Sequence, residues 1–241
     1  MPNALEINGL NKKYRNSRGV FDINLSIGEG EVYGFLGPNG SGKTTTMKII
    51  AGLLRPDSGT VKIMGNDIND SFEEAMRNMG CLFESIVHYD YLSAEDNLKQ
   101  AARFFPETDA DSRIAEVLEL VGLERNRRDK VSTFSLGMRQ RLALAGCIYH
   151  RPRFLMLDEP MNGLDIEGVV AIRNVILDMV KNGAACFISS HMSSEIQKTC
   201  GKVSVITDGR IISTGYLKDI LQKHESVEDY FISVVRPQEV Q

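Results

Sequence analysis

The segment "GPNGSGKT", from Gly37 to Thr44, is the most informative part of the chain. It matches the pattern G-x-x-x-x-G-K-[ST] and lies between a strand-like run, "VYGFL", and a helix-like run, "TTMKIIAGLL". Glycines let such a loop wrap closely, so that successive backbone N–H groups point inward at phosphate oxygens. We therefore predict a phosphate-binding loop, in which Lys43 reaches the β- and γ-phosphates of a nucleotide and the Thr44 hydroxyl binds Mg²⁺.

An acidic pair follows another apolar run, in "RFLMLDEP". Four apolar residues bring the chain out of the sheet at Asp158, which would hold Mg²⁺ directly or through water. Glu159 follows, placed to polarise the attacking water as a general base. Alone, an acidic pair after a strand would be a solvated turn in most proteins, but beside a phosphate loop it predicts a hydrolytic site.

His191 comes just after a third apolar run, "ACFISS". A lone histidine is more often a structural residue. In an open α/β sheet, however, ligands bind beyond the carboxyl ends of the strands, where the phosphate loop and Asp158 also lie. His191 could therefore donate to the γ-phosphate.

The segment "TFSLGMRQRL", from Thr133 to Leu142, reads as the start of a helix with Ser135 as its N-cap. A helix N-terminus carries unpaired N–H groups and a partial positive charge, so it can receive an anion. The simpler interpretation is that Ser135 only caps a core helix.

Strand and helix patterns alternate along much of the chain, which predicts a mostly parallel sheet with helices on both faces. From about Ser71 to His150 the pattern turns helical. We therefore expect residues 1–84 and 151–220 to form a nucleotide-binding core, about 85–150 to form an inserted helical lobe, and 221–241 to form a C-terminal tail.

The composition is that of an ordinary globular chain: 241 residues, 42% hydrophobic and 25% charged. The net charge of -4 gives no overall attraction to nucleic acid or anionic lipid. The four cysteines lie far apart with no C-x-x-C pair, which favours reduced thiols in a cytosolic protein. No signal-peptide pattern and no apolar run long enough to span a membrane are found, so we expect any membrane connection to run through a partner.

These motifs, in this order, resemble the ATP-binding subunit of ATP-binding-cassette (ABC) transporters. The order is "GPNGSGKT", a helical region with "FSLGMRQ", then "LMLDEP", "NGLD" and "SSH", and the resemblance covers about residues 4–215. It implies an α/β fold: a P-loop NTPase core with a mostly parallel sheet, an N-terminal antiparallel β subdomain and the inserted helical lobe. The first and third motifs correspond to the family's Walker A and Walker B motifs.

The resemblance also implies roles for matching residues. Tyr14 in "KKYRN" sits where an aromatic ring stacks on adenine; alternatively it is a strand-edge aromatic. Asp165 in "NGLD" sits where the two ATP sites of a dimer are linked, and His191 matches the switch histidine. The segment around Ser135 and Gly137 matches the signature that binds the γ-phosphate of ATP held by the opposite subunit.

Two departures from the family pattern point to one branch. Glu84 in "CLFESIV" replaces a glutamine that usually contacts Mg²⁺ or water, so it keeps an oxygen ligand but adds a charge. Leu136 and Met138 replace the signature's Gly and Gln. Both departures resemble the drug- and bacteriocin-exporting branch, including bacitracin-resistance and lantibiotic self-protection ATPases.

The sequence thus predicts an ATPase with ATP and Mg²⁺ as cofactors. It would work on the cytoplasmic face of the membrane with permease subunits and a second ATP-binding subunit, and without nucleic acid. The permease would dock near "ESIVHYDYL", where His88, Tyr89 and Tyr91 either contact it or are ordinary lobe residues. The alternatives are a soluble relative acting on nucleic acid or ribosomes and a regulator that binds nucleotide without hydrolysis.

The candidate site residues are therefore these. The catalytic candidates are Lys43, Glu159 and His191, and the metal candidates are Thr44, Asp158 and Glu84. The cofactor-binding candidates are Tyr14, Gly37, Pro38, Asn39, Gly40, Ser41, Gly42, Lys43, Thr44, Thr45, Glu84, Ser135, Gly137 and Asp165.

Overall fold

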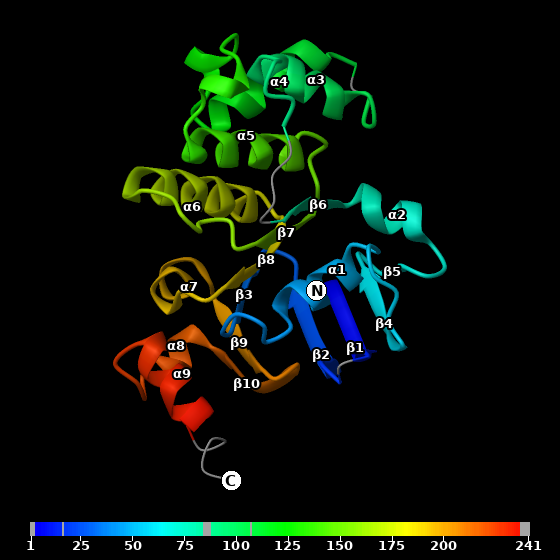
Figure 1. Cartoon of the computed structure of the whole chain (residues 1–241), viewed down its shortest axis with the longest axis vertical. Helices are drawn as coiled ribbons and strands as arrows, with labels where there is room; N and C mark the ends of the chain where they lie inside the picture. The colour runs from blue at the N-terminus through cyan, green and yellow to red at the C-terminus, as the bar shows by residue number, and fades with distance from the viewer. Residues whose placement is uncertain (1–2, 16, 84–87, 107, 237–241) are drawn as a thin grey trace.

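A six-stranded sheet runs through the centre of the molecule in the computed structural model, which describes residues 3–15, 17–83, 88–106 and 108–236 (Figure 1). Its strand order is β10-β9-β3-β8-β7-β6. The strands are β3 (Val32–Leu36), β6 (Met79–Leu82), β7 (Phe154–Asp158), β8 (Ala185–Ser190), β9 (Lys202–Thr207) and β10 (Arg210–Tyr216). Neighbours are parallel except for β10, which pairs antiparallel with β9. The predicted mostly parallel sheet is confirmed.

A smaller antiparallel sheet, in the order β2-β1-β4-β5, lies beside α1. It consists of β1 (Asn3–Lys13), β2 (Gly19–Gly28), β4 (Ser58–Ile63) and β5 (Asn66–Asp67). This is the antiparallel N-terminal part that the resemblance implied.

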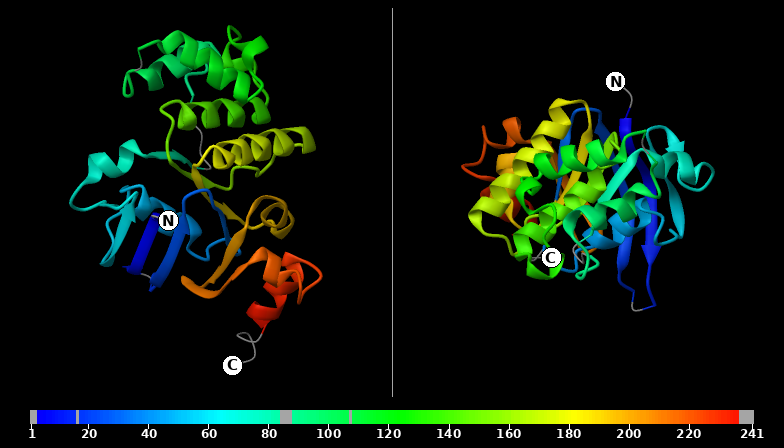
Figure 2. Two further views of the ribbon diagram at one scale, coloured as in Figure 1. Left: turned by 180° about the vertical axis from the view of Figure 1, so that it is seen from behind. Right: turned by 90° about the horizontal axis from the view of Figure 1, so that it is seen from above.

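The helices surround the central sheet (Figures 1 and 2). They are α1 (Lys43–Ile50), α2 (Phe72–Arg77), α3 (Ala94–Ala102), α4 (Ala110–Leu120), α5 (Leu136–Ile148), α6 (Ile166–Lys181), α7 (Ser193–Thr199), α8 (Leu217–Ile220) and α9 (Val227–Val235), with short 3₁₀ turns at Glu124–Asn126 and Val131–Thr133. In the front and back views α3, α4 and α5 gather at one end of the molecule, and α6 lies next to α5.

The central strands separate two apolar cores because successive side chains point to opposite faces. Val32 and Ile188 lie in the core shared with α3 to α9, whereas Tyr33, Phe35 and Phe187 lie in the core shared with α1, α2 and the small sheet. The rings of Phe35 and Phe187 pack at 5.3 Å between centroids. Burial on both faces explains why these strands are continuous apolar runs in the sequence.

Residues 79–82 depart from the prediction, because they form the edge strand β6 rather than part of a helical region. The prediction was wrong here since a short apolar run does not distinguish strand from helix by periodicity. Gly80 makes the strand possible beside α5: a Cβ on this residue would lie 2.4 Å from the carbonyl oxygen of Cys147. Glycine thus lets the backbones of β6 and α5 approach closely.

The far end of α5 is held by a buried arginine on α4. Arg113, which is 4% exposed, donates from Nε to the Tyr149 carbonyl at 2.7 Å and from Nη2 to the Ile148 carbonyl at 2.6 Å. The last carbonyls of a helix have no partner within the helix, so this side chain satisfies them. The contact fixes α5, and with it the position of Ser135 at its start.

Candidate functional site

The loop from Gly37 to Thr44 joins β3 to α1 at the carboxyl end of the central sheet. Gly42 precedes the helix with a φ of 110°, a conformation that L side chains rarely adopt, and a Cβ there would lie 2.8 Å from Val20 Cγ1. The loop can therefore wrap tightly around the start of α1 only because this position is glycine.

Lys43 and Thr44 turn from this loop toward the end of β7. The Lys43 ammonium donates to the Gly37 carbonyl at 2.7 Å and lies 3.3 Å from Glu159 Oε1. Thr44 Oγ1 donates to Asp158 Oδ2 at 2.9 Å. The phosphate loop and the acidic pair, which lie far apart in the sequence, are thus in direct contact.

Ser189 is a residue of this site that the sequence analysis did not single out. It is fully buried on β8 directly opposite Asp158 in the parallel pair. Its hydroxyl donates to Asp158 Oδ1 at 2.5 Å and accepts from the Glu159 backbone N–H at 3.0 Å. The available signal was the change from apolar to polar residues at the end of "ACFISS", which marks where β8 meets the site.

Glu159 has an unusual backbone conformation, with a φ of 49°. For a residue other than glycine such a conformation costs about 1–3 kcal/mol and persists when the surroundings hold it. Here Ser189 holds the backbone N–H, and the carboxylate is placed between Lys43 and His191, whose Nδ1 lies 2.9 Å from Oε2. This backbone conformation therefore directs the Glu159 carboxylate toward the phosphate loop.

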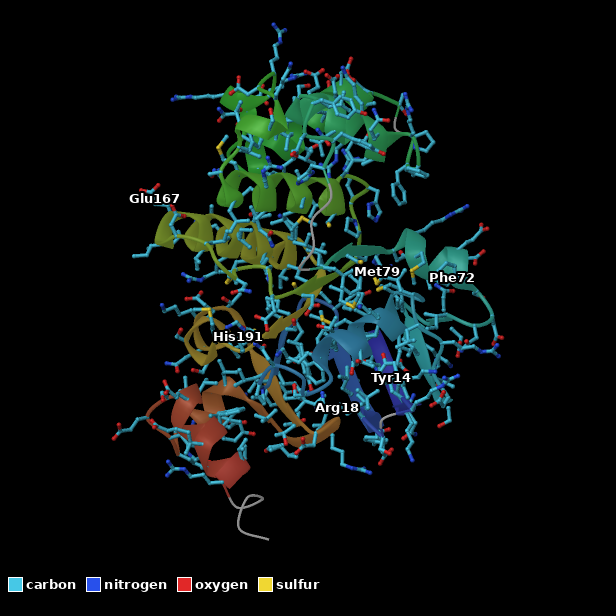
Figure 3. All side chains as sticks on the ribbon, viewed as in Figure 1. Tyr14, Arg18, Phe72, Met79, Glu167 and His191 are labelled. Carbon is cyan, nitrogen blue, oxygen red and sulfur yellow. The ribbon has the colours of Figure 1, made fainter. Side chains whose placement is uncertain are left out.

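A pocket of about 340 Å³ opens above these residues. It gathers nine of the predicted site residues: Tyr14, Asn39, Gly40, Gly42, Lys43, Thr44, Thr45, Glu159 and His191. Tyr14 follows β1 and is 41% exposed, while His191 lies at the start of α7 (Figure 3). Arg18, Gly19 and Asn162 also line the pocket and were not predicted, since only the fold brings them here.

Other predicted residues lie apart from this pocket. Ser135 caps α5 as predicted, accepting from the Met138 N–H at 3.2 Å, and it is exposed together with Leu136. Asp165 caps α6 by accepting from the Gly168 N–H at 2.9 Å. Gly37, Pro38 and Ser41 belong to the phosphate loop but do not line this pocket, and neither does Gly137, which lies on α5. Glu84 lies outside the described residues.

A second, larger hollow of about 710 Å³ lies between β6, α3 and α5. Its walls are largely apolar, and two of them are strongly exposed side chains: Leu53 at 68% and Phe104 at 81%. His88 also lines it, and burial lowers the pKa of this imidazole below its usual value. Exposed apolar side chains around such a hollow are a common feature of interaction surfaces.

Comparisons with known proteins agree on one family. A sequence model described as "ABC transporter" matches residues 20–162. The chain is 40% identical over 240 residues to the uncharacterized ABC transporter ATP-binding protein YhcH of Bacillus subtilis, covering 99% of this chain and 78% of that protein. It is 38% identical over 213 residues to the bacitracin transport ATP-binding protein BcrA of Bacillus licheniformis, covering 88% and 69%.

Solved structures give the same result. A structure described as the ATP-binding subunit of an ABC transporter superposes with a TM-score of 0.86 at 26% identity, covering 96% of this chain and 99% of that chain. In the described part of the chain, no helix is both long and apolar enough to cross a membrane.

Proposed function

The chain belongs to the ABC transporter family of ATP-binding subunits, which hydrolyse ATP, and on this premise we propose that it powers export through separate membrane permease subunits. The observation that carries the proposal is the single contact network of Lys43, Thr44, Asp158, Glu159 and His191. The similarity to a bacitracin transport protein supports a drug or antibiotic peptide as the exported substrate.

In the proposed reaction the residues of one chain bind and activate ATP. Lys43 and His191 donate to the γ-phosphate, which disperses the charge that develops there. Glu159 accepts a proton from the attacking water and is aimed by its contacts with His191 and Ser189. Tyr14, at the rim of the pocket, stacks on the adenine ring.

The residues present fit a magnesium ion. Mg²⁺ prefers oxygen ligands and usually takes one or two carboxylates together with phosphate oxygens. The Thr44 hydroxyl and the Asp158 carboxylate meet at 2.9 Å beside the phosphate loop, and these two groups would hold the ion. When bound, it would neutralise charge on the phosphates.

A second subunit completes the site in this proposal. Ser135 and Gly137 lie at an exposed helix start, where backbone N–H groups can receive an anion from outside the chain. They would bind the γ-phosphate of ATP held by the opposite subunit, and Asp165 would link the two ATP sites. Leu136 and Met138 leave the backbone donors in place, so we expect the signature to function.

The larger hollow is the proposed docking site for the permease, on the cytoplasmic face of the membrane. Tyr89 lines it, and Tyr91 lies close by with 70% of its surface exposed. In this arrangement residues of about 85–150 act as a helical lobe that carries both the docking surface and Ser135. Residues 1–84 and 151–220 act as the nucleotide-binding core, and 221–241 as its C-terminal tail. Glu84 would relay the state of the ATP site to the junction where the permease docks.

The permease is first identified as the membrane protein that co-purifies with this chain. The test is then an ATPase assay on the purified chain, alone and with membranes that contain that permease. We expect hydrolysis that the Lys43→Ala variant loses and that permease-containing membranes change. Stimulation by nucleic acid or ribosomes instead of by those membranes would contradict the transport function. Nucleotide binding without turnover in either setting would contradict the ATPase function.

A further inference from the structure

A buried ion pair connects the helices that follow His191 and Asp165. Arg173 on α6 and Glu195 on α7 meet at 2.6 Å between Nη2 and Oε2, with side chains only 17% and 10% exposed. Glu195 lies four residues after His191, in the first turn of α7, and Arg173 lies eight residues after Asp165, about two turns into α6. The pair therefore joins the two segments across the molecule rather than along the chain.

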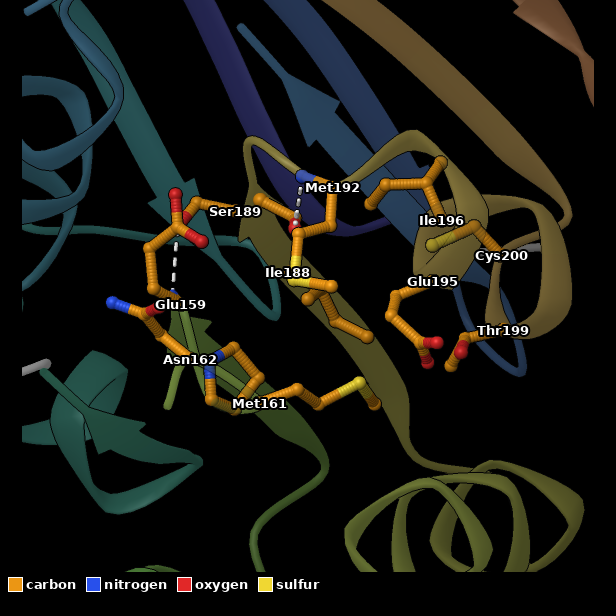
Figure 4. Close-up of a pocket in the computed structure, with 12 residues that line it drawn as sticks. Glu159, Met161, Asn162, Ile188, Ser189, Met192, Glu195, Ile196, Thr199 and Cys200 are labelled. Carbon is orange, nitrogen blue, oxygen red and sulfur yellow. Dashed lines mark hydrogen bonds between the residues drawn. The ribbon is translucent and has the colours of Figure 1, made fainter. Parts of the chain in front are cut away.

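One member of the ion pair, Glu195, lines the same small pocket as the proposed catalytic carboxylate. Glu195 lines a small pocket whose other walls include Glu159, Asn162 and Ser189 (Figure 4). Glu159 in turn contacts His191 through Oε2. A continuous series of contacts thus runs from Glu159 through His191 and the first turn of α7 to Glu195, and then through Arg173 along α6 to Asp165.

Stability alone does not account for two charges in this position. Removing charges from water is costly, and apolar residues in place of a buried pair are often as stable or more so. Moreover, the contact is made through one guanidinium nitrogen, and Arg173 Nε has no hydrogen-bond partner among the described residues. A single contact fixes the distance between α6 and α7 while letting them rotate, unlike a two-bond fork.

We propose that the Arg173–Glu195 ion pair is a positioning strut that makes the His191 turn and the Asp165 loop move together. The inference rests on the proposed function, in which His191 faces the ATP of its own chain and Asp165 faces the other subunit. Neither Arg173 nor Glu195 touches the reacting atoms. Their role is to keep Glu159 and His191 aligned when the second subunit engages the Asp165 loop.

The test compares variants that differ in charge but hardly in shape. Glu195→Gln removes one charge, and we expect kcat for ATP hydrolysis to fall by about 10- to 100-fold, because small misplacement of catalytic groups is enough for such a loss. We expect KM for ATP to stay unchanged. The melting temperature should fall because the Arg173 charge loses its partner, so kcat is compared well below the melting temperature of both variants. Lys198→Gln is the matched control, since Lys198 contacts the same carboxylate at 3.6 Å from the exposed side.

Rescue separates a strut from ordinary packing. Arg173→Lys should keep more activity than Arg173→Gln, and the double variant Arg173→Gln/Glu195→Gln should be no worse than either single variant, because both changes break the same contact. The charge-exchanged pair Arg173→Glu/Glu195→Arg restores opposite charges at the two positions, so it should recover activity. If a single variant is too unstable to assay, this double variant still tests the proposal. Additive losses, or a kcat for Glu195→Gln equal to that of Lys198→Gln, overturn the proposal.

The same assay separates this proposal from the proposed function. If Lys43→Ala loses turnover but Glu195→Gln does not, only the strut is wrong. If Lys43→Ala is as active as the unaltered chain, the proposed function is wrong and the strut fails with it.

Discussion

In the proposed function the phosphate loop and the start of α5 both receive phosphate, but the two regions differ in how their groups are paired. At the phosphate loop, Lys43 and Asp158 are buried and bonded to other residues of the site. At the start of α5, Ser135 is exposed, and its hydroxyl makes the short-range contact that caps its own helix. The first region is assembled within one chain, whereas the second lies exposed at the surface.

This difference suggests a division of labour between two copies. A site that hydrolyses ATP must hold a base and charge-neutralising groups in fixed positions around the attacking water. The chain supplies these at the phosphate loop through contacts between β7, β8 and α1. In the proposed function the exposed helix start would add its donors only when another subunit arrives, which would couple assembly to hydrolysis. The following changes test the two regions separately.

The largest effect is expected in the site beside the phosphate loop. Glu159→Gln keeps the shape of the side chain but removes the base, so turnover should fall by about 10²- to 10⁴-fold. ATP binding should remain, and the protein should accumulate as an ATP-bound dimer in size-exclusion chromatography. Glu167→Gln on exposed α6 surface is the control. Turnover at the normal rate would show that Glu159 is not the base.

The second-largest effect is expected at the start of α5, where Ser135 can be replaced by two residues that cap a helix equally well but differ in charge. Asn and Asp both cap helices as well as Ser, so Ser135→Asn and Ser135→Asp should leave the melting temperature unchanged. Only Asp places a negative charge where the partner's phosphate would bind. We expect Ser135→Asp to weaken ATP-dependent dimerisation and turnover by about tenfold or more, because like charges in an interface cost several kcal/mol.

The matched Ser135→Asn variant decides how that loss is interpreted. It should dimerise and hydrolyse ATP nearly as well as the unaltered chain. If both variants behave alike, Ser135 is only a helix cap and the two regions do not cooperate.

The smallest effect is expected at Ser189, which holds Asp158 and Glu159 in place from the neighbouring strand β8. Ser189→Ala removes a hydroxyl that bonds both Asp158 and the Glu159 N–H, so the free energy of unfolding should fall by about 1–3 kcal/mol. Denaturant titration measures this change. Ser190→Ala, which removes a hydroxyl bonded to the Met192 N–H, is the neighbouring control for loss of a serine. Equal losses in both variants would mean that Ser189 has no special part in the site.

The sequence carries much of this site because its main residues adjoin recognisable local patterns. Lys43 and Thr44 come with the loop, and Asp158, Glu159 and His191 come at the ends of apolar strands, which parallel pairing brings to one edge. Ser189 and Asn162 were missed, since their roles arise from the register of β7 against β8 and from loop packing. The Arg173–Glu195 contact was missed for the same reason: residues 22 positions apart meet only in the folded chain.

Prediction of the fold from the sequence is limited in the same way. The helices with strong periodicity were predicted, but β6 was assigned to a helical region because "MGCL" is too short to show a period. Its place at the sheet edge depends on Gly80 lying under α5, a contact between distant parts of the sequence. Local sequence patterns thus predict individual helices and strands, whereas contacts between distant residues determine which strand lies at the edge of the sheet.

The most direct measurement is the structure of the Glu159→Gln chain with ATP and Mg²⁺. The account predicts a dimer in which Ser135 of each subunit lies within hydrogen-bond distance of the γ-phosphate held by Lys43 of the other. A complex in which ATP contacts only the chain whose phosphate loop holds it, with Ser135 still exposed to solvent, would contradict the proposed cooperation between the two regions.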